Sequence, residues 1–220
     1  MTNRACGDEV GTDAQCAGSA APGEPEGTVD LSTFSAKSYD RGASAVKEFA
    51  WLVVQKLFFE FPPFPLYGIR RSLLRLFGAK VGRGVVIKPG VRITFPWKLE
   101  LGNNVWLGED CWLLNAGRIT IGDNVCISQR AMLVAGGHDH SSPTFDVFTS
   151  PIVVERGAWI CAGAWVGPGV TVRTHAILGI GSVATKTLEP YGIYRGVPAV
   201  KVRTREIRPT GQVAQRSHTE

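Results

Sequence analysis

Two histidines lie close together in a glycine-rich stretch of the chain, VAGGHDHSSPTFDVFTSPIV at 134–153. His138 follows a pair of glycines, and His140 lies two positions further on. Imidazole is the side chain whose ordinary pKa lies nearest neutral pH, so a loop histidine can take the proton of an attacking hydroxyl. A histidine in a polar loop can also be a solvent-exposed residue with no catalytic role. The residues alone leave both interpretations open.

The sequence on either side of this stretch repeats every six residues. Each hexad is typical of one short strand and a turn with its hydrophobic side chain inside, and stacked coils of this kind bury a continuous core. About five coils fit before residue 190. The repeat fails once, between Leu133 and Val154, and solenoids often carry such insertions on the working face. The seventeen hydrophobic positions of the repeat are Val81, Ile87, Ile93, Leu99, Leu101, Leu107, Leu113, Ile119, Ile121, Ile127, Leu133, Val154, Ile160, Val166, Val172, Leu178 and Ala184.

Composition and periodicity divide the chain into four parts. Residues 1–30 are polar and acidic with no hydrophobic period, which predicts a disordered tail. A helical lead-in over 31–80 precedes the β-solenoid of 81–205, and we expect a flexible C-terminal tail over 206–220. The net charge of +5 hides an uneven distribution, which is −5 in the tail, +5 in the lead-in, +1 over 81–184 and +4 beyond. A nucleic-acid module would carry a basic stripe through its folded part, so we predict no nucleic-acid partner.

Cysteine usage and the N-terminal residues indicate a cytoplasmic protein. The chain has five cysteines, an odd number, with no C-x-x-C pair, which favours reduced thiols over a disulfide framework. The start, MTNRACGDEVGTDAQC, is polar and acidic, so it is not a secretory signal. Apolar runs such as AWLVV at 50–54 are far shorter than the ~20 residues that span a bilayer.

Three longer segments resemble a known family. They are RSLLRLFGAKVGRGVVIKPGVRITFPWKLELGNN, ITIGDNVCISQRAMLVAGGHDHSSPTFD and GVPAVKVRTR. Together with the hexad repeat they resemble the hexapeptide-repeat acyltransferases, in the branch that acetylates in colanic acid biosynthesis. The resemblance implies an all-β fold, a left-handed parallel β-helix, assembled as a homotrimer. It also implies acetyl transfer from acetyl-CoA to a sugar hydroxyl of an exopolysaccharide unit or its lipid-linked precursor, with no metal.

The resemblance assigns roles to several residues of the insertion and its surroundings. The family's catalytic histidine follows a Gly-Asp-Asn by sixteen residues, and an ungapped alignment from Gly122 places His138 there as the general base. Asp139 could orient that imidazole or contact substrate, with a solvated loop acid as the alternative. His140 is a candidate substrate contact, with loop decoration as the alternative. Asn115 is the candidate for the acceptor-binding asparagine of a related branch, with a turn residue as the alternative.

The last coils match the part of the family that binds the cofactor. There the pantetheine arm lies along small residues in a groove between two subunits, because it must reach backbone amides. Ile180 departs from the family's usual alanine. Cations near the nucleotide end suit its phosphates. The predicted acetyl-CoA contacts are Ala162, Gly179, Ile180, Thr185, Lys186 and Arg203.

Other functions remain open from the sequence. Some trimeric β-helices bind zinc through three histidines and act as carbonic anhydrases. Here the pair is H-x-H, and His175 follows it, so the spacing does not match. Within the acetyltransferase class, the acceptor could instead be an antibiotic, an amino acid or a lipochitooligosaccharide. A non-catalytic β-helix scaffold is the alternative from a different class.

Two amphipathic helices are predicted in the lead-in, over 43–59 and 66–78, on either side of the breaker FPPFP. Arg70, Arg71 and Arg75 give the second helix a basic face. The helices could cap the open end of the β-helix or contact an anionic membrane through 43–78. The aromatic side chains that suit either role are Trp51, Phe58, Phe59, Phe61 and Phe64.

Overall fold

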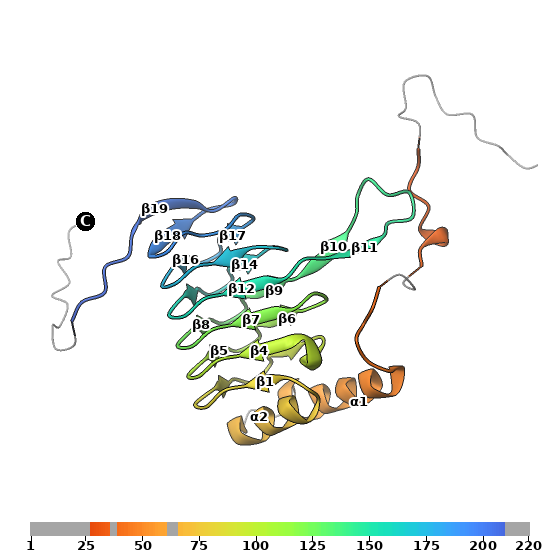
Figure 1. Cartoon of the computed structure of the whole chain (residues 1–220), viewed down its shortest axis with the longest axis horizontal. Coiled ribbons are helices and arrows are strands. Elements are labelled where there is room, and N and C mark those ends of the chain that lie inside the picture. The colour runs from red at the N-terminus through yellow and green to blue at the C-terminus, as the bar shows by residue number, and fades with distance from the viewer. Residues whose placement is uncertain (1–26, 36–38, 61–65, 210–220) are drawn as a thin grey trace, which may run out of the picture.

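The computed structural model describes residues 27–35, 39–60 and 66–209. Three parallel sheets run along a β-helix, and two helices lie across one end of it (Figure 1). The predicted hexapeptide-repeat β-helix with an N-terminal helical segment is confirmed. Most of the predicted tails, residues 1–26 and 210–220, lies outside the described residues.

Each side of the β-helix is one sheet. The first holds β1 (Lys80–Val81), β4 (Leu99–Leu101), β7 (Ile119–Ile121), β12 (Ile152–Val154) and β15 (Thr171–Val172). The second holds β2 (Val86–Ile87), β5 (Trp106–Leu107), β8 (Cys126–Ile127), β13 (Trp159–Ile160), β16 (Ile177–Leu178), β18 (Gly192–Arg195) and β19 (Val200–Thr204). The third holds β3 (Arg92–Ile93), β6 (Trp112–Leu114), β9 (Met132–Val134), β14 (Trp165–Val166) and β17 (Val183–Ala184).

The register of the strands follows from the repeat. Leu101 pairs with Ile121, twenty residues on, and Ile121 pairs with Val154 across the insertion. A bridge from Val172 to Leu188 begins a sixth coil, so five complete coils precede it. Of the seventeen predicted inward positions, all but Val81 are buried, and Val81 packs against the core.

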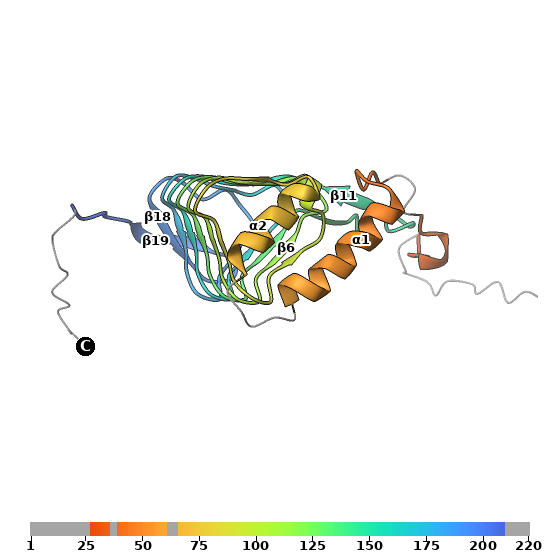
Figure 2. The same ribbon diagram turned by 90° about the horizontal axis from the view of Figure 1, so that it is seen from below.

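The two predicted helices are present with slightly different bounds. α1 spans Ala45–Gln55 and continues as a π-helical turn over Lys56–Glu60, and α2 spans Tyr67–Leu76. Both lie across the first coil (Figure 2). Trp51 and Phe59 are buried in the core, so they are not available for membrane contact, while Phe61 and Phe64 lie outside the described residues.

The basic face of α2 points into the first coil. Fully buried Arg70 donates from Nη1 to the Ile87 carbonyl at 2.9 Å and from Nε to the Phe58 carbonyl at 2.8 Å. Arg71 donates to the Val85 carbonyl at 2.7 Å, and Arg75 donates to the carbonyls of Val81 and Gly82. Since a buried carbonyl without a partner is costly, these contacts make α2 a cap for the end of the β-helix.

We expect the Arg70→Met variant to lose about 3 kcal/mol of unfolding free energy, because it leaves two backbone carbonyls unpaired at ~1–3 kcal/mol each. Chemical denaturation followed by circular dichroism measures this loss. The matched control is Arg75→Met, whose guanidinium is exposed and should cost about 1 kcal/mol or less. Equal losses for the two variants would contradict the cap assigned to Arg70.

Candidate active site

The insertion folds into a β-hairpin arm that projects from the third coil (Figure 1). β10 (Gly136–His138) pairs antiparallel with β11 (Val147–Thr149), and His138 lies opposite Val147. A Cβ on Gly136 would lie 2.7 Å from the Phe148 carbonyl oxygen. Glycine is therefore the residue that lets the strand leave the coil so close to its partner.

His138 is exposed at the end of β10 and held on three sides. Its Nδ1 lies 2.7 Å from the carbonyl oxygen of Phe145, and the two rings stack at 4.3 Å with an 8° interplanar angle. Phe34 approaches the ring edge-on at 5.6 Å. A carbonyl oxygen can only accept, so Nδ1 carries the proton in this contact and the neutral ring keeps its lone pair on Nε2.

Phe145 holds the histidine from a strained backbone conformation. Its φ is +54°, in the left-handed region that a bulky residue seldom adopts. The turn around it is closed by a bond from the Phe145 N–H to the Ser142 carbonyl at 3.0 Å. Strain of this kind persists only where the surrounding structure enforces it, and it gathers at functional sites.

The N-terminal segment runs beside the arm (Figure 1). The Asp30 N–H donates to the Pro143 carbonyl at 2.9 Å, and a short 3-10 helix over Leu31–Thr33 leads to Phe34. Residues 27–30, which the sequence assigned to the tail, thus include a contact to the arm. The segment closes one side of the space around His138.

The other predicted residues of the insertion have different surroundings. Asp139 accepts bonds from the Ser141 N–H at 2.9 Å and the Ser141 hydroxyl at 2.6 Å, and the hydroxyl bond lowers the pKa of the carboxyl. This carboxylate therefore organises the turn. His140 is exposed beyond the end of β10.

Asn115, the candidate acceptor contact, lies buried between two coils. Its side chain is fully buried, and its amide accepts from the Phe95 N–H at 2.9 Å and donates to the Phe95 carbonyl. The amide thus replaces a missing rung of the ladder between two coils.

An open pocket of about 340 Å³ lies at the base of the arm. Val147 and Thr149 contribute to its wall, and alternation along the strand puts them on the ribbon face that carries His138. Its other lining residues are Tyr39, Asp40, Lys98, Ala116, Gly117 and Arg118. None of these was predicted from the sequence, because they come together only through contacts between distant segments.

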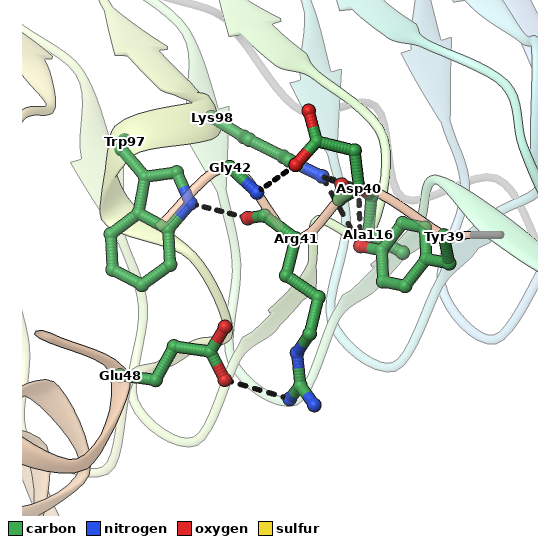
Figure 3. Close-up of polar contacts among 8 residues, drawn as sticks. All are labelled: Tyr39, Asp40, Arg41, Gly42, Glu48, Trp97, Lys98 and Ala116. Atoms are coloured by element: carbon green, nitrogen blue, oxygen red, sulfur yellow. Dashed lines mark hydrogen bonds and ion pairs between the residues drawn. The ribbon is translucent and has the colours of Figure 1, made fainter. Parts of the chain in front are cut away.

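Lys98 ties the segment over residues 39–42 to the wall of this pocket (Figure 3). Its Nζ donates to the carbonyls of Asp40 at 2.7 Å and Ala116 at 2.9 Å, and it lies 3.3 Å from the Tyr39 hydroxyl. Burial lowers the pKa of Lys98 and raises the pKa of Tyr39. The Tyr39 hydroxyl in turn donates to the Ala116 carbonyl at 2.8 Å, so the segment is fixed in place.

A groove of about 470 Å³ follows the second sheet on the other side of the β-helix. It brings together Gly179, Ile180 and Arg203 of the predicted cofactor residues. The half-buried Ala162 and the exposed Thr185 and Lys186 are not part of its lining. A Cβ on Gly179 would lie 3.0 Å from the Tyr194 carbonyl oxygen, so glycine keeps the floor of the groove low.

This groove continues into a second hollow of about 630 Å³, with which it shares Trp159, Ile177, Ile193 and Arg203. Four arginines line the two hollows: Arg195, Arg203, Arg205 and Arg208. Guanidinium groups at this density suit phosphate ligands. The sequence indicated only one of the four as a cofactor contact, because their convergence depends on β19 folding back along β18.

The third histidine of the described residues is His175. His175 is at a corner of a coil with φ +57° and stacks on Tyr191 at 5.0 Å. Within the described ranges, no group of three or more His, Cys, Asp or Glu side chains is close enough to hold a metal ion. Three cysteines of this part of the chain, Cys111, Cys126 and Cys161, are free thiols.

Comparison with known proteins identifies relatives of this chain. No protein-family model matches it. It is 44% identical over 176 residues to WcaF of Escherichia coli, named as a colanic acid biosynthesis acetyltransferase, covering 80% of this chain and 97% of that protein. It is 28% identical over 137 residues to the galactoside O-acetyltransferase of Escherichia coli, covering 61% of this chain and 68% of that protein.

Solved structures share the fold. A galactoside acetyltransferase in complex with coenzyme A matches with a TM-score of 0.67 and 25% identity, covering 73% of this chain and 82% of that one. A hexapeptide-repeat acetyltransferase of Vibrio cholerae matches with a TM-score of 0.68 and 22% identity, covering 76% of this chain and 92% of that one. The chain therefore belongs to the hexapeptide-repeat acyltransferases, in the branch of the colanic acid biosynthesis acetyltransferases.

Proposed function

We propose that this protein transfers an acetyl group from acetyl-CoA to a sugar hydroxyl, in the assembly of an exopolysaccharide, with His138 as general base. The observation that carries the proposal is the contact between His138 Nδ1 and the Phe145 carbonyl at 2.7 Å, which leaves Nε2 free to take a proton. The 44% identity to WcaF supports the polysaccharide context. We expect the reaction in the cytoplasm, where acetyl-CoA is available.

The chemistry is direct transfer in a ternary complex. The sugar hydroxyl oxygen attacks the thioester carbonyl carbon while its proton passes to Nε2 of His138. The tetrahedral intermediate then collapses, the carbon–sulfur bond breaks, and the same proton passes to the departing CoA thiolate. Since imidazole changes charge near neutral pH, it can act first as base and then as acid.

The pocket at the base of the arm is our proposed acceptor site. It lies on the face of the hairpin that carries His138, which is where an attacking hydroxyl has to be. The Tyr39 hydroxyl, the Asp40 carboxylate and the Thr149 hydroxyl offer hydrogen bonds suited to a polyhydroxylated ligand. Asp139 and His140 stay as lesser candidates, because they lie beyond the arm's paired strands.

The arginine-lined groove is our proposed site for acetyl-CoA. Gly179 gives the pantetheine arm close access to backbone, and the exposed side chain of Ile180 forms one edge. Arg195 and Arg203 lie where the phosphates would follow. Ala162, Thr185 and Lys186 do not line this groove. They would contact acetyl-CoA only where the cofactor extends beyond the groove of a single chain.

A single chain does not bring the two sites together. The arm projects from one side of the β-helix, and β18, which carries part of the groove lining, lies on the opposite side in both views (Figures 1 and 2). One acetyl-CoA therefore cannot lie in the groove and reach His138 of the same chain. We infer that the active site forms between two copies in a homotrimer, each giving its arm to the groove of a neighbour.

Release of free CoA thiol tests the proposed function. Purified protein is mixed with acetyl-CoA and a panel of monosaccharides and oligosaccharides, with an amino acid and an aminoglycoside for comparison. The proposal predicts turnover that depends on a sugar acceptor and an O-acetylated sugar as product. Turnover with the non-sugar acceptors alone would overturn the choice of substrate, and turnover with none of them would favour a scaffold.

We expect Arg203→Ala to raise the KM for acetyl-CoA about tenfold with little change in kcat, because it removes one charge-assisted contact made equally by substrate and transition state. Initial rates at varied acetyl-CoA measure both constants. Arg130→Ala is the matched control, since Arg130 is an exposed arginine that does not line the groove. An unchanged KM for Arg203→Ala would contradict the assigned groove.

A further inference from the structure

The outward face of α1 and the turn that follows is apolar along its whole length. Val46 is 79% exposed, Phe49 69%, Val53 42% and Leu57 58%. Their spacing of three, four and four residues puts them on one stripe of the helix, opposite the buried Trp51. A surface helix normally presents polar residues on the side away from the core. An exposed apolar stripe of this kind is typical of a surface that contacts a partner.

α2 repeats the pattern at the same end of the molecule (Figure 2). Leu76 is 77% exposed and Ile69 47% exposed, while Arg70 and Leu74 of the same helix are buried against the first coil. α1 thus has a capping inner side and an apolar outer side, while the outer side of α2 presents Ile69 and Leu76 beside the exposed Ser72 and Arg75. We call the outward residues Val46, Phe49, Val53, Leu57, Ile69 and Leu76 the basal face.

Cations border the basal face. Residues 41–88 hold nine Lys and Arg and two acids, and three of the nine, Arg70, Arg71 and Arg75, donate to carbonyls of the first coil. Lys56 lies next to the stripe with its side chain 73% exposed and forms an ion pair with Glu60, and Lys80 of the first coil is 77% exposed and pairs with Glu100. An apolar helix face edged by Lys and Arg matches the two layers of an anionic membrane surface, acyl chains beneath negative headgroups.

We propose that the basal face docks this protein onto the surface of an anionic lipid bilayer. A second copy is the other apolar occupant to consider, and charge opposes it, because base-to-base contact would bring two strongly positive surfaces together. No helix of the described residues is long and apolar enough to cross a bilayer, so the contact lies in the interface plane. Lipid docking and capping are compatible, since they use opposite sides of the same helices.

Vesicle flotation of the full chain tests the proposal without needing acetyl transfer. We expect binding to vesicles of phosphatidylcholine with phosphatidylglycerol, weaker binding to phosphatidylcholine alone, and loss of binding as salt rises. The double variant F49S/V53S should reduce binding at least ~tenfold, because it removes two side chains from the lipid-facing stripe. The control V29S/L31S removes two comparably exposed apolar side chains elsewhere and should bind as the unchanged protein does.

The outcomes of these experiments distinguish a lipid bilayer from a second copy as the partner of the basal face. Failure of the unchanged protein to bind anionic vesicles, or equal binding by F49S/V53S, overturns the proposal. A second copy would be favoured, and the proposal overturned, if the protein did not bind vesicles but sedimented as a larger assembly that F49S/V53S does not form. Thermal unfolding of both variants shows that the fold is intact, which we expect because all four side chains are exposed.

Discussion

The His138→Ala variant is expected to lose about 10²–10⁴-fold in kcat, the usual contribution of a positioned general base. The sugar hydroxyl is a poor nucleophile near neutral pH, and in this variant no side chain stands where Nε2 of His138 stood. The His138 side chain is exposed, so its removal should leave the unfolding free energy within about 0.5 kcal/mol. Single-turnover release of CoA with an identified acceptor measures the chemical step directly.

His140→Ala is the matched control for this prediction. It removes an imidazole from the same loop, two residues away, that is exposed beyond the paired strands. Its rate should lie within about threefold of the unchanged enzyme. If His138→Ala released CoA as fast as His140→Ala, the general base would have to be another group.

The repeat predicts most of the fold because each coil requires inward hydrophobic side chains at the same positions. A six-residue period locates the inward side chains, and the register of twenty residues follows from three hexads and a corner. The hexad does not predict a second inward position, which lies two residues before most of the aliphatic ones. Small side chains alternate there with valine, as at Val105, Cys111 and Ala131, so a simple hydrophobic pattern does not reveal it.

The candidate site was predicted less completely. His138 could be proposed from the sequence because it has a fixed offset from Gly122 along the chain, and the break in the repeat marks its loop. The pocket beside it depends on Lys98 meeting Tyr39 and Asp40, nearly sixty residues earlier in the chain. Such long-range contacts have no local signal, and the sequence likewise does not show that the amide of Asn115 pairs with Phe95.

The placement of arm and groove on opposite sides of one β-helix is the feature with the largest consequence. If each site takes His138 from one copy and the groove from the next, two inactive variants can restore each other. His138→Ala keeps the groove, and the double variant R195E/R203E keeps the histidine while reversing the charge at the phosphate end. Both changes fall on exposed side chains, so both variants should fold and assemble.

Mixing these two variants is the most direct test. In randomly mixed trimers, half of the copies supply an intact histidine and half of their neighbours an intact groove, so about a quarter of wild-type activity should return. Each variant alone should stay at its own low rate, and mass measurement in solution should give the mixed trimer. A mixture no more active than its parents, or a protein that is a monomer in solution, would contradict an active site shared between copies.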